Sequence, residues 1–138
     1  KINIKKNNFL KKELLMPTKI YVKEILNLTE RKLINGCANI TGGGLLENLI
    51  RVIPKKLSIS INLSKIKTKP IFKWIKENNV RDSEMIKTFN CGVGFCLITN
   101  KKNVAKIKNI FPKKYLPYEI GYVSKEKKRI KLLGKILW

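Results

Sequence analysis

The sequence predicts an α+β domain in which helices are layered on a mixed β-sheet. Some segments carry apolar residues at helical spacing, and others alternate apolar and polar residues as a half-buried strand does. The two kinds of segment follow one another through short connections, which favours a layered domain of sheet and helix. No helix is predicted between the last two strands, so the sheet should be mixed.

Length and terminal residues set the expected organisation. At 138 residues the chain is long enough for one domain with a core and too short for two. We predict a basic N-terminal arm or connector over residues 1–15 and the α/β domain over residues 16–138. The first residue is Lys1 rather than Met, which favours a fragment of a longer protein. Without a secretory signal or an apolar run near the ~20 residues of a membrane helix, a cytoplasmic, membrane-free domain is expected.

The first predicted helix begins at Pro17 and Thr18, because the fixed φ of proline suits the first helical turn. It closes at Asn35-Gly36. Part of its apolar face is supplied by Ile20, Ile25 and Leu28.

A strand, a turn and a helix follow without a break. The strand covers residues 37–40, the turn contains Thr41 and three glycines, and the helix runs from residue 45 to 53 before Pro54 stops it. The helix is amphipathic. Its apolar face carries Leu45, Leu46, Leu49, Ile50 and Ile53, and its polar face carries Glu47, Asn48 and Arg51.

Residues 57–63 (LSISINL) alternate, which predicts a strand with one buried face and an outer Ser/Asn face. Residues 92–99 are strongly apolar and are predicted to form a central strand. The remaining elements are helices from Pro70, from Asp82 towards Phe89 and over 103–111, and strands over 119–124 and 129–137.

The net charge of +22 permits two interpretations. It would suit a nucleic-acid partner. However, 27 of the 31 basic residues are Lys and four are Arg, whereas base and phosphate recognition favours the planar donor fork of Arg. Codons for Lys, Asn and Ile are rich in A and T, and these residues are all abundant. We therefore favour a solvated lysine surface and expect neither a nucleic-acid nor a membrane partner.

Residue types also limit the chemistry. The chain has three cysteines, no histidine and one aspartate, Asp82. Cys91 and Cys96 are expected to be buried free thiols, with no disulfide framework and no zinc site. No nucleophile has an adjacent base and no nearby carboxylates could hold Mg²⁺. We assign no catalytic residue and no metal ligand to this chain.

The candidate binding site centres on Thr41, Gly42, Gly43 and Gly44, hereafter the glycine turn. Glycines at a strand-to-helix turn can adopt positive φ and bring bare N–H groups to a ligand, and the following helix adds its free N–H groups and positive dipole end. A phosphate or carboxylate would suit the turn. The glycine spacing matches no defined phosphate-binding fingerprint, so a tight turn without a ligand is the alternative interpretation.

Two residues on the polar face of the following helix extend this candidate site. Asn48 lies one turn beyond Gly44, and Arg51 lies a further turn on, about 10 Å along the axis from the helix start. Both could line a cleft. An exposed i,i+4 pair between Glu47 and Arg51 is the alternative.

A second candidate segment is residues 89–94 (FNCGVG), which supplies Asn90 and Gly92. Gly92 and Gly94 are two apart, so in a strand they would clear one face for a ligand, a helix or another domain. Packing against another element is the interpretation we favour.

Several motifs, taken in order, resemble the phosphoribosylformylglycinamidine cyclo-ligase family, also called aminoimidazole ribonucleotide synthetase. The match covers about residues 15–123 and corresponds to the C-terminal domain of that family. The motifs are residues 16–23 (MPTKIYVK), 40–44 (ITGGG), Glu47-Asn48, Arg51, Pro54, Trp74, Asn79-Val80, Glu84-Met85 and 88–94 (TFNCGVG). Two residues depart from the family pattern. The family usually has Arg where this chain has Lys19, and often has His where this chain has Asn39.

The resemblance implies a reaction and partners. ATP phosphorylates the amide oxygen of formylglycinamidine ribonucleotide, the internal amine closes the imidazole ring, and aminoimidazole ribonucleotide, ADP and phosphate are released. ATP and Mg²⁺ are the implied cofactors, with ligands expected mainly from an N-terminal domain that this chain lacks. That domain and a homodimer are the implied partners. The glycine turn, Asn48 and Arg51 would face the substrate, and Asn90 and Gly92 would form another wall.

Two other functions are weighed against this one. A sister superfamily member, such as the formylglycinamide ribonucleotide amidotransferase, is disfavoured by the PTKIYVK stretch. A stand-alone basic nucleic-acid-binding module would bind random DNA tightly and with a steep salt dependence.

Overall fold

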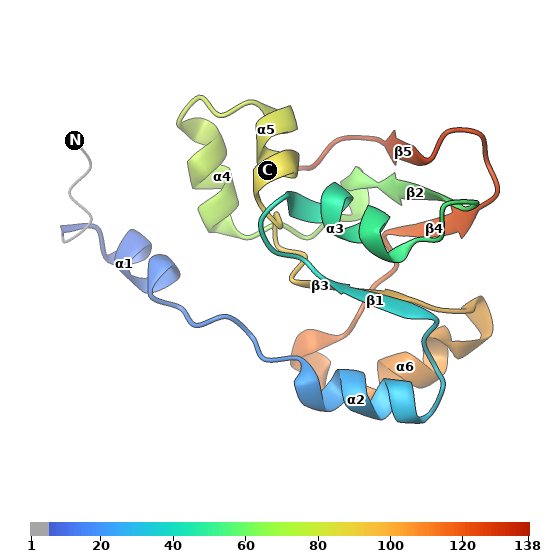
Figure 1. Cartoon of the computed structure of the whole chain (residues 1–138). Helices are drawn as coiled ribbons and strands as arrows, with labels where there is room; N and C mark the ends of the chain where they lie inside the picture. The colour runs from blue at the N-terminus through green and yellow to red at the C-terminus, as the bar shows by residue number, and fades with distance from the viewer. Residues whose placement is uncertain (1–5) are drawn as a thin grey trace.

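Residues 6–138 are described by the computed structural model, and helices and strands are interspersed along them (Figure 1). The helices are α1 (Asn8–Leu14), α2 (Val22–Glu30), α3 (Gly44–Val52), α4 (Pro70–Glu77), α5 (Asp82–Thr88) and α6 (Val104–Ile110). The strands are β1 (Gly36–Asn39), β2 (Ser58–Asn62), β3 (Phe95–Ile98), β4 (Gly121–Ser124) and β5 (Ile130–Leu133). Short 3₁₀ helices occupy Leu63–Lys65, Lys101–Asn103 and Lys113–Tyr115. No helix within this range is long and apolar enough to cross a bilayer.

The strands confirm the predicted α+β class and divide into two sheets. In the three-stranded sheet, β2 lies between antiparallel β4 and parallel β5, so this sheet is mixed, as predicted. β1 and β3 form a separate antiparallel pair. The last two strands flank β2 instead of pairing with each other, because the segment between them crosses from one edge of β2 to the other (Figure 1).

The strand predicted over residues 92–99 is present over Phe95–Ile98, but its predicted start at residue 92 and its predicted central position are wrong. The strand β3 covers Phe95–Ile98 and belongs to the two-stranded sheet with β1. Cys91 and Gly92 have φ of 49° and 99°, which is left-handed backbone and cannot continue a β-ladder. These two residues form a turn, so the strand begins after Gly94.

The prediction of an exposed serine face on β2 is also wrong, since Ser58 and Ser60 are 2% and 1% exposed. Ser60 pairs with Tyr122 on one side and Lys131 on the other, and both neighbours carry far larger side chains. The hydroxyl of Ser58 lies 2.9 Å from that of Ser124 and accepts a hydrogen bond from the Glu126 N–H at 2.8 Å. A small side chain on a central strand is thus covered by its neighbours even where the pattern predicts an outer face.

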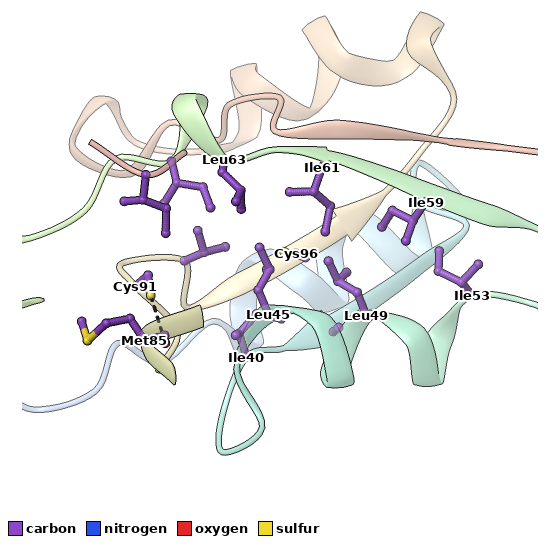
Figure 2. Packing of buried hydrophobic residues seen from close by; sticks show 14 residues of the cluster. Ile40, Leu45, Leu49, Ile53, Ile59, Ile61, Leu63, Met85, Cys91 and Cys96 are labelled. Carbon is purple, nitrogen blue, oxygen red and sulfur yellow. Dashed lines mark hydrogen bonds between the residues drawn. The ribbon is translucent and has the colours of Figure 1, made fainter. Parts of the chain in front are cut away.

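The core lies between α3 and the two sheets (Figure 2). Leu45 and Leu49 of α3 are buried together with Ile59 and Ile61 of β2, and Cys96 of β3 lies in the same cluster (Figure 2). Burial of each such aliphatic side chain stabilises the fold by about 1.5–3 kcal/mol. The predicted apolar face of the helix over residues 45–53 is therefore confirmed.

The N-terminal part differs from its prediction at both ends of the first helix. α1 lies within the predicted arm, where the Asn7 side chain accepts a hydrogen bond from the Leu10 N–H at 3.0 Å; residues 1–5 of that arm lie outside the described residues. α2 begins at Val22 rather than Pro17 and ends at Glu30 rather than at Asn35-Gly36. Tyr21 is the N-cap residue: its carbonyl accepts the first helical hydrogen bond, from the Ile25 N–H at 3.0 Å, and its ring packs against Phe95 of β3, with ring centroids 5.1 Å apart.

The apolar stripe predicted for this helix gives a test of the fold. Leu28 is 0% exposed and Ile20 is 80% exposed, so only one of these two stripe residues is in the interior. We expect Leu28→Ala to lower the free energy of unfolding by about 2–5 kcal/mol. The matched Ile20→Ala variant should change it by less than about 0.5 kcal/mol. Urea denaturation followed by circular dichroism measures both, and equal losses would contradict the described position of α2.

Candidate functional site

The glycine turn connects the end of β1 to the start of α3. Gly43 and Gly44 have φ of 88° and 63°, which confirms the predicted positive φ. The Gly44 N–H donates to the Thr41 carbonyl at 3.2 Å and closes the turn. Just before it, the Ile40 N–H donates to the Gly94 carbonyl at 3.0 Å, which anchors the turn beside β3.

One side of the glycine turn is closed by α5. A Cβ at Gly44 would overlap the Ile86 carbonyl oxygen and lie 3.0 Å from the Lys87 carbonyl carbon, so only glycine allows α3 this close approach. A Cβ at Gly42, in contrast, would meet no heavy atom of residues 6–138 within 4 Å. The turn is thus clamped at Gly44 and open at Gly42.

Asn48 holds the glycine turn from inside. Asn48 is only 7% exposed. Its side-chain amide nitrogen donates to the backbone carbonyls of Gly44 at 2.7 Å, Gly42 at 3.2 Å and Thr41 at 3.4 Å. A buried amide that satisfies backbone carbonyls stabilises the local conformation, since an unpaired group there would cost about 1–3 kcal/mol. The structure therefore gives Asn48 a supporting position under the turn, and its direct contact with a ligand stays a prediction.

Arg51 takes part in the ion pair that was the alternative interpretation. Its Nη2 lies 3.7 Å from Oε2 of Glu47, and both side chains are exposed. Such a pair contributes only about 0.3–0.5 kcal/mol. A Cβ at Gly43 would overlap the Glu47 carboxylate, so that carboxylate lies against the glycine turn. An anion approaching the turn therefore meets Glu47, whose charge Arg51 offsets.

Asn90 and Gly92 form a second turn, beside the glycine turn. The Asn90 side chain accepts a hydrogen bond from the Gly92 N–H at 3.0 Å, and its carbonyl accepts one from the Val93 N–H at 2.9 Å. A Cβ at Gly92 would lie 2.7 Å from the Lys67 carbonyl oxygen. The prediction that Gly92 and Gly94 clear one face of a strand is therefore wrong, because both precede β3. The favoured interpretation, that another element packs closely against these glycines, is confirmed at Gly92.

The fold brings the two turns together. Hydrogen bonding between Ile40 and Gly94 joins their ends, and the contact of Gly44 with α5 places the glycine turn against the helix that leads into Asn90. The predicted site residues therefore lie on two neighbouring turns and on α3, and the side chains of Asn48 and Asn90 bind backbone groups around them.

A cavity of 870 Å³ lies elsewhere and was not predicted from the sequence. Of the predicted site residues it includes Gly92, and it is otherwise lined by residues such as Lys19, Tyr21, Tyr115 and Tyr118. Tyrosines and lysines do recur close together in residues 19–21 and 113–118, and this repetition is the signal that could have indicated a shared site.

Chemistry by thiols or a metal finds little support in the described residues. Cys91 and Cys96 are buried, as predicted, and burial raises the pKa of Cys91 to about 11 and that of Cys96 to about 12, so both stay protonated near neutral pH. Asp82 pairs with Lys76 at 3.2 Å and accepts a hydrogen bond from the Trp138 indole at 3.1 Å. In residues 6–138 no three His, Cys, Asp or Glu side chains cluster to hold a metal ion.

Known proteins are similar to this sequence over most of its length. Residues 2–132 match the family described as AIR synthase related protein, C-terminal domain. The phosphoribosylformylglycinamidine cyclo-ligase of Streptococcus pneumoniae serotype 4 (strain ATCC BAA-334 / TIGR4) is 42% identical over 118 residues, which are 85% of this chain and 34% of that protein. The protein of the same name from Streptococcus gordonii (strain Challis) has the same identity and coverage, 42% over 118 residues. The chain thus spans about a third of the length of these curated relatives.

The asymmetry of the glycine turn can be tested with two alanine variants. Gly44→Ala adds a Cβ at positive φ against a carbonyl oxygen, so we expect a loss of about 2 kcal/mol or more in unfolding free energy. Gly42→Ala adds the same group in open space, and a change below about 0.5 kcal/mol is expected. Denaturant unfolding of both variants is the measurement. A stable Gly44→Ala protein would show that α3 and α5 do not meet as described.

Proposed function

The chain belongs to the family of AIR synthase related proteins, as their C-terminal domain, and we propose that it is the substrate-facing domain of an ATP-dependent cyclo-ligase of purine biosynthesis. The observation that carries the proposal is the 42% identity to cyclo-ligases over 85% of the chain. In the proposed reaction, formylglycinamidine ribonucleotide and ATP give aminoimidazole ribonucleotide, ADP and phosphate.

The proposed role of this domain is to bind and position the substrate. Backbone donors held in a fixed turn can stabilise negative charge without reorganising, which is how a preorganised site lowers a barrier. Two observations support this role for the glycine turn: Asn48 and the contact of Gly44 with α5 hold it in place, and Gly42 stays open. A phosphate group of the substrate is the anion we assign to its open side.

Glu47 and Arg51 place one negative and one positive charge beside the glycine turn. The Glu47 carboxylate beside Gly43 opposes an incoming anion, and Arg51 reaches it only at 3.7 Å. When a phosphate binds, Arg51 can turn towards it while its other guanidinium donors stay near Glu47, since the guanidinium has five donors. Arg51 would then contribute to substrate affinity more than to stability.

The nucleotide and metal chemistry is assigned to the rest of the longer protein. The described residues do not fit a Mg²⁺ site, because their carboxylates do not cluster. An N-terminal domain that supplies most of the ATP site, a homodimer and a cytoplasmic location complete the proposal.

Replacement of a domain tests the function. The matching 118 residues of the S. pneumoniae relative would be exchanged for those of this chain, and ADP release would be measured with formylglycinamidine ribonucleotide. The proposal expects turnover by the hybrid that depends on the ribonucleotide, and none by the 138-residue chain alone. A hybrid that folds, binds ATP and gives no ribonucleotide-dependent turnover would contradict it.

Arg51 and Glu47 separate binding from stability within the same hybrid. We expect Arg51→Ala to reduce kcat/KM by about tenfold or more, the loss of one charge-assisted hydrogen bond, while the chain's unfolding free energy changes by less than about 0.5 kcal/mol. Glu47→Ala breaks the same ion pair but keeps the guanidinium, so it should retain activity. Equal losses in the two variants would assign Arg51 to the ion pair alone.

A further inference from the structure

The 870 Å³ cavity is bounded by two sheets and the segments between β3 and β4. Its floor is apolar and comes from several elements at once: Ile59 and Ile61 of β2, Leu97 of β3, Ile107 of α6 and Val123 of β4. Cavities of roughly 300–1,000 Å³ with apolar walls are the usual size of small-molecule sites. The floor therefore favours a ligand with an apolar body.

The cavity lining is strongly basic. Six lysines line it, against a single acidic residue, Glu119. The ion pairs of the described residues involve other cations, namely Arg51, Lys76 and Lys131. The lining lysines are Lys19, Lys67, Lys101, Lys108, Lys113 and Lys114. An excess of positive charge in a concave surface favours an anion, and one with two or more charges over one with a single charge.

Three of these lysines lie over aromatic rings, and Lys114 is one of them, with its ammonium 5.5 Å from the centroid of the Tyr115 ring. The Lys19 ammonium lies 3.7 Å from the centroid of the Tyr115 ring and 5.0 Å from that of Tyr21. The Lys67 ammonium lies 5.0 Å from the centroid of the Tyr118 ring, and the Lys67 N–H donates to the Tyr118 hydroxyl at 3.1 Å. These contacts restrict flexible side chains before a ligand binds, which lowers the entropic cost of binding.

The aromatic rings also offer a surface for the ligand body. Tyr21 and Phe95 pack with centroids 5.1 Å apart, and both line the cavity. Burial, with Tyr115 nearby, raises the pKa of Tyr21, so its hydroxyl stays a neutral donor at physiological pH. Planar groups bind well against such rings.

We infer that this cavity is a second ligand site, for a phosphorylated small molecule with an aromatic body. The apolar floor and the rings take the body, and Lys19 with its neighbouring lysines takes the phosphate. Of the residues of the proposed substrate site only Gly92 lines this cavity, whereas the glycine turn, Asn48, Arg51 and Asn90 lie outside the lining. The inference therefore does not depend on the proposed function.

Three related probes test the inference on the 138-residue chain by isothermal titration calorimetry. The probes are 1-naphthyl phosphate, inorganic phosphate and 1-naphthol, which carry body and charge, charge alone and body alone. We expect 1-naphthyl phosphate to bind with a Kd at least about tenfold lower than either control, and to weaken as salt rises. Equal binding of naphthyl phosphate and phosphate, or of naphthyl phosphate and naphthol, would overturn the inference, as would no binding.

Variants locate the binding. Lys19→Gln and Tyr115→Leu should each weaken 1-naphthyl phosphate about five- to tenfold, because one removes the charge and the other the ring that positions it. Lys55→Gln is the matched control, since Lys55 is exposed and lies outside the lining. Circular dichroism shows whether each variant is folded. A loss as large in Lys55→Gln as in Lys19→Gln would mean diffuse attraction to a basic surface and would contradict the site.

The outcomes remain distinct from those of the proposed function. An inactive hybrid enzyme with intact naphthyl phosphate binding would reject the cyclo-ligase proposal alone. An active hybrid with no naphthyl phosphate binding by the chain would reject the second site alone.

Discussion

The close contact of Gly44 with the last turn of α5 is the constraint on which the site depends. A side chain at this position would overlap the backbone carbonyls of Ile86 and Lys87. The contact fixes where α3 begins, and Asn48, one turn later, then reaches the carbonyls of the glycine turn. Because α5 leads directly into Asn90, the same contact sets the distance between the two turns. A strand-to-helix corner thereby becomes a rigid loop with one open side.

Local patterns predicted the parts of the fold that depend on local physics. The spacing of Leu45, Leu49 and Ile53 fixes the buried face of α3, and alternation in residues 57–63 identifies β2. The positive φ of Gly43 and Gly44 follows from glycine itself. Residue type at the turn was therefore informative before any contact was known.

Contacts between distant segments could not be predicted in the same way. Cys91 has a φ of 49° because the chain turns there, and cysteine carries no signal for that conformation. The burial of Ser60 depends on Tyr122 and Lys131, which are paired with it only in the folded sheet. The position of Lys19 against Tyr115 likewise requires residues almost a hundred positions apart to meet. The sequence shows that lysine is abundant, but only the fold shows which lysines line the cavity.

The central proposal is that the glycine turn is a preorganised anion site. The most direct measurement is a ¹⁵N–¹H spectrum of the labelled chain during titration with inorganic phosphate at constant ionic strength. The account predicts saturable shifts of the Gly42 and Gly43 amide signals, and their loss in the Asn48→Ala variant. If those two signals stay in place while phosphate shifts only lysine-rich segments, the turn is a structural corner and the central claim fails.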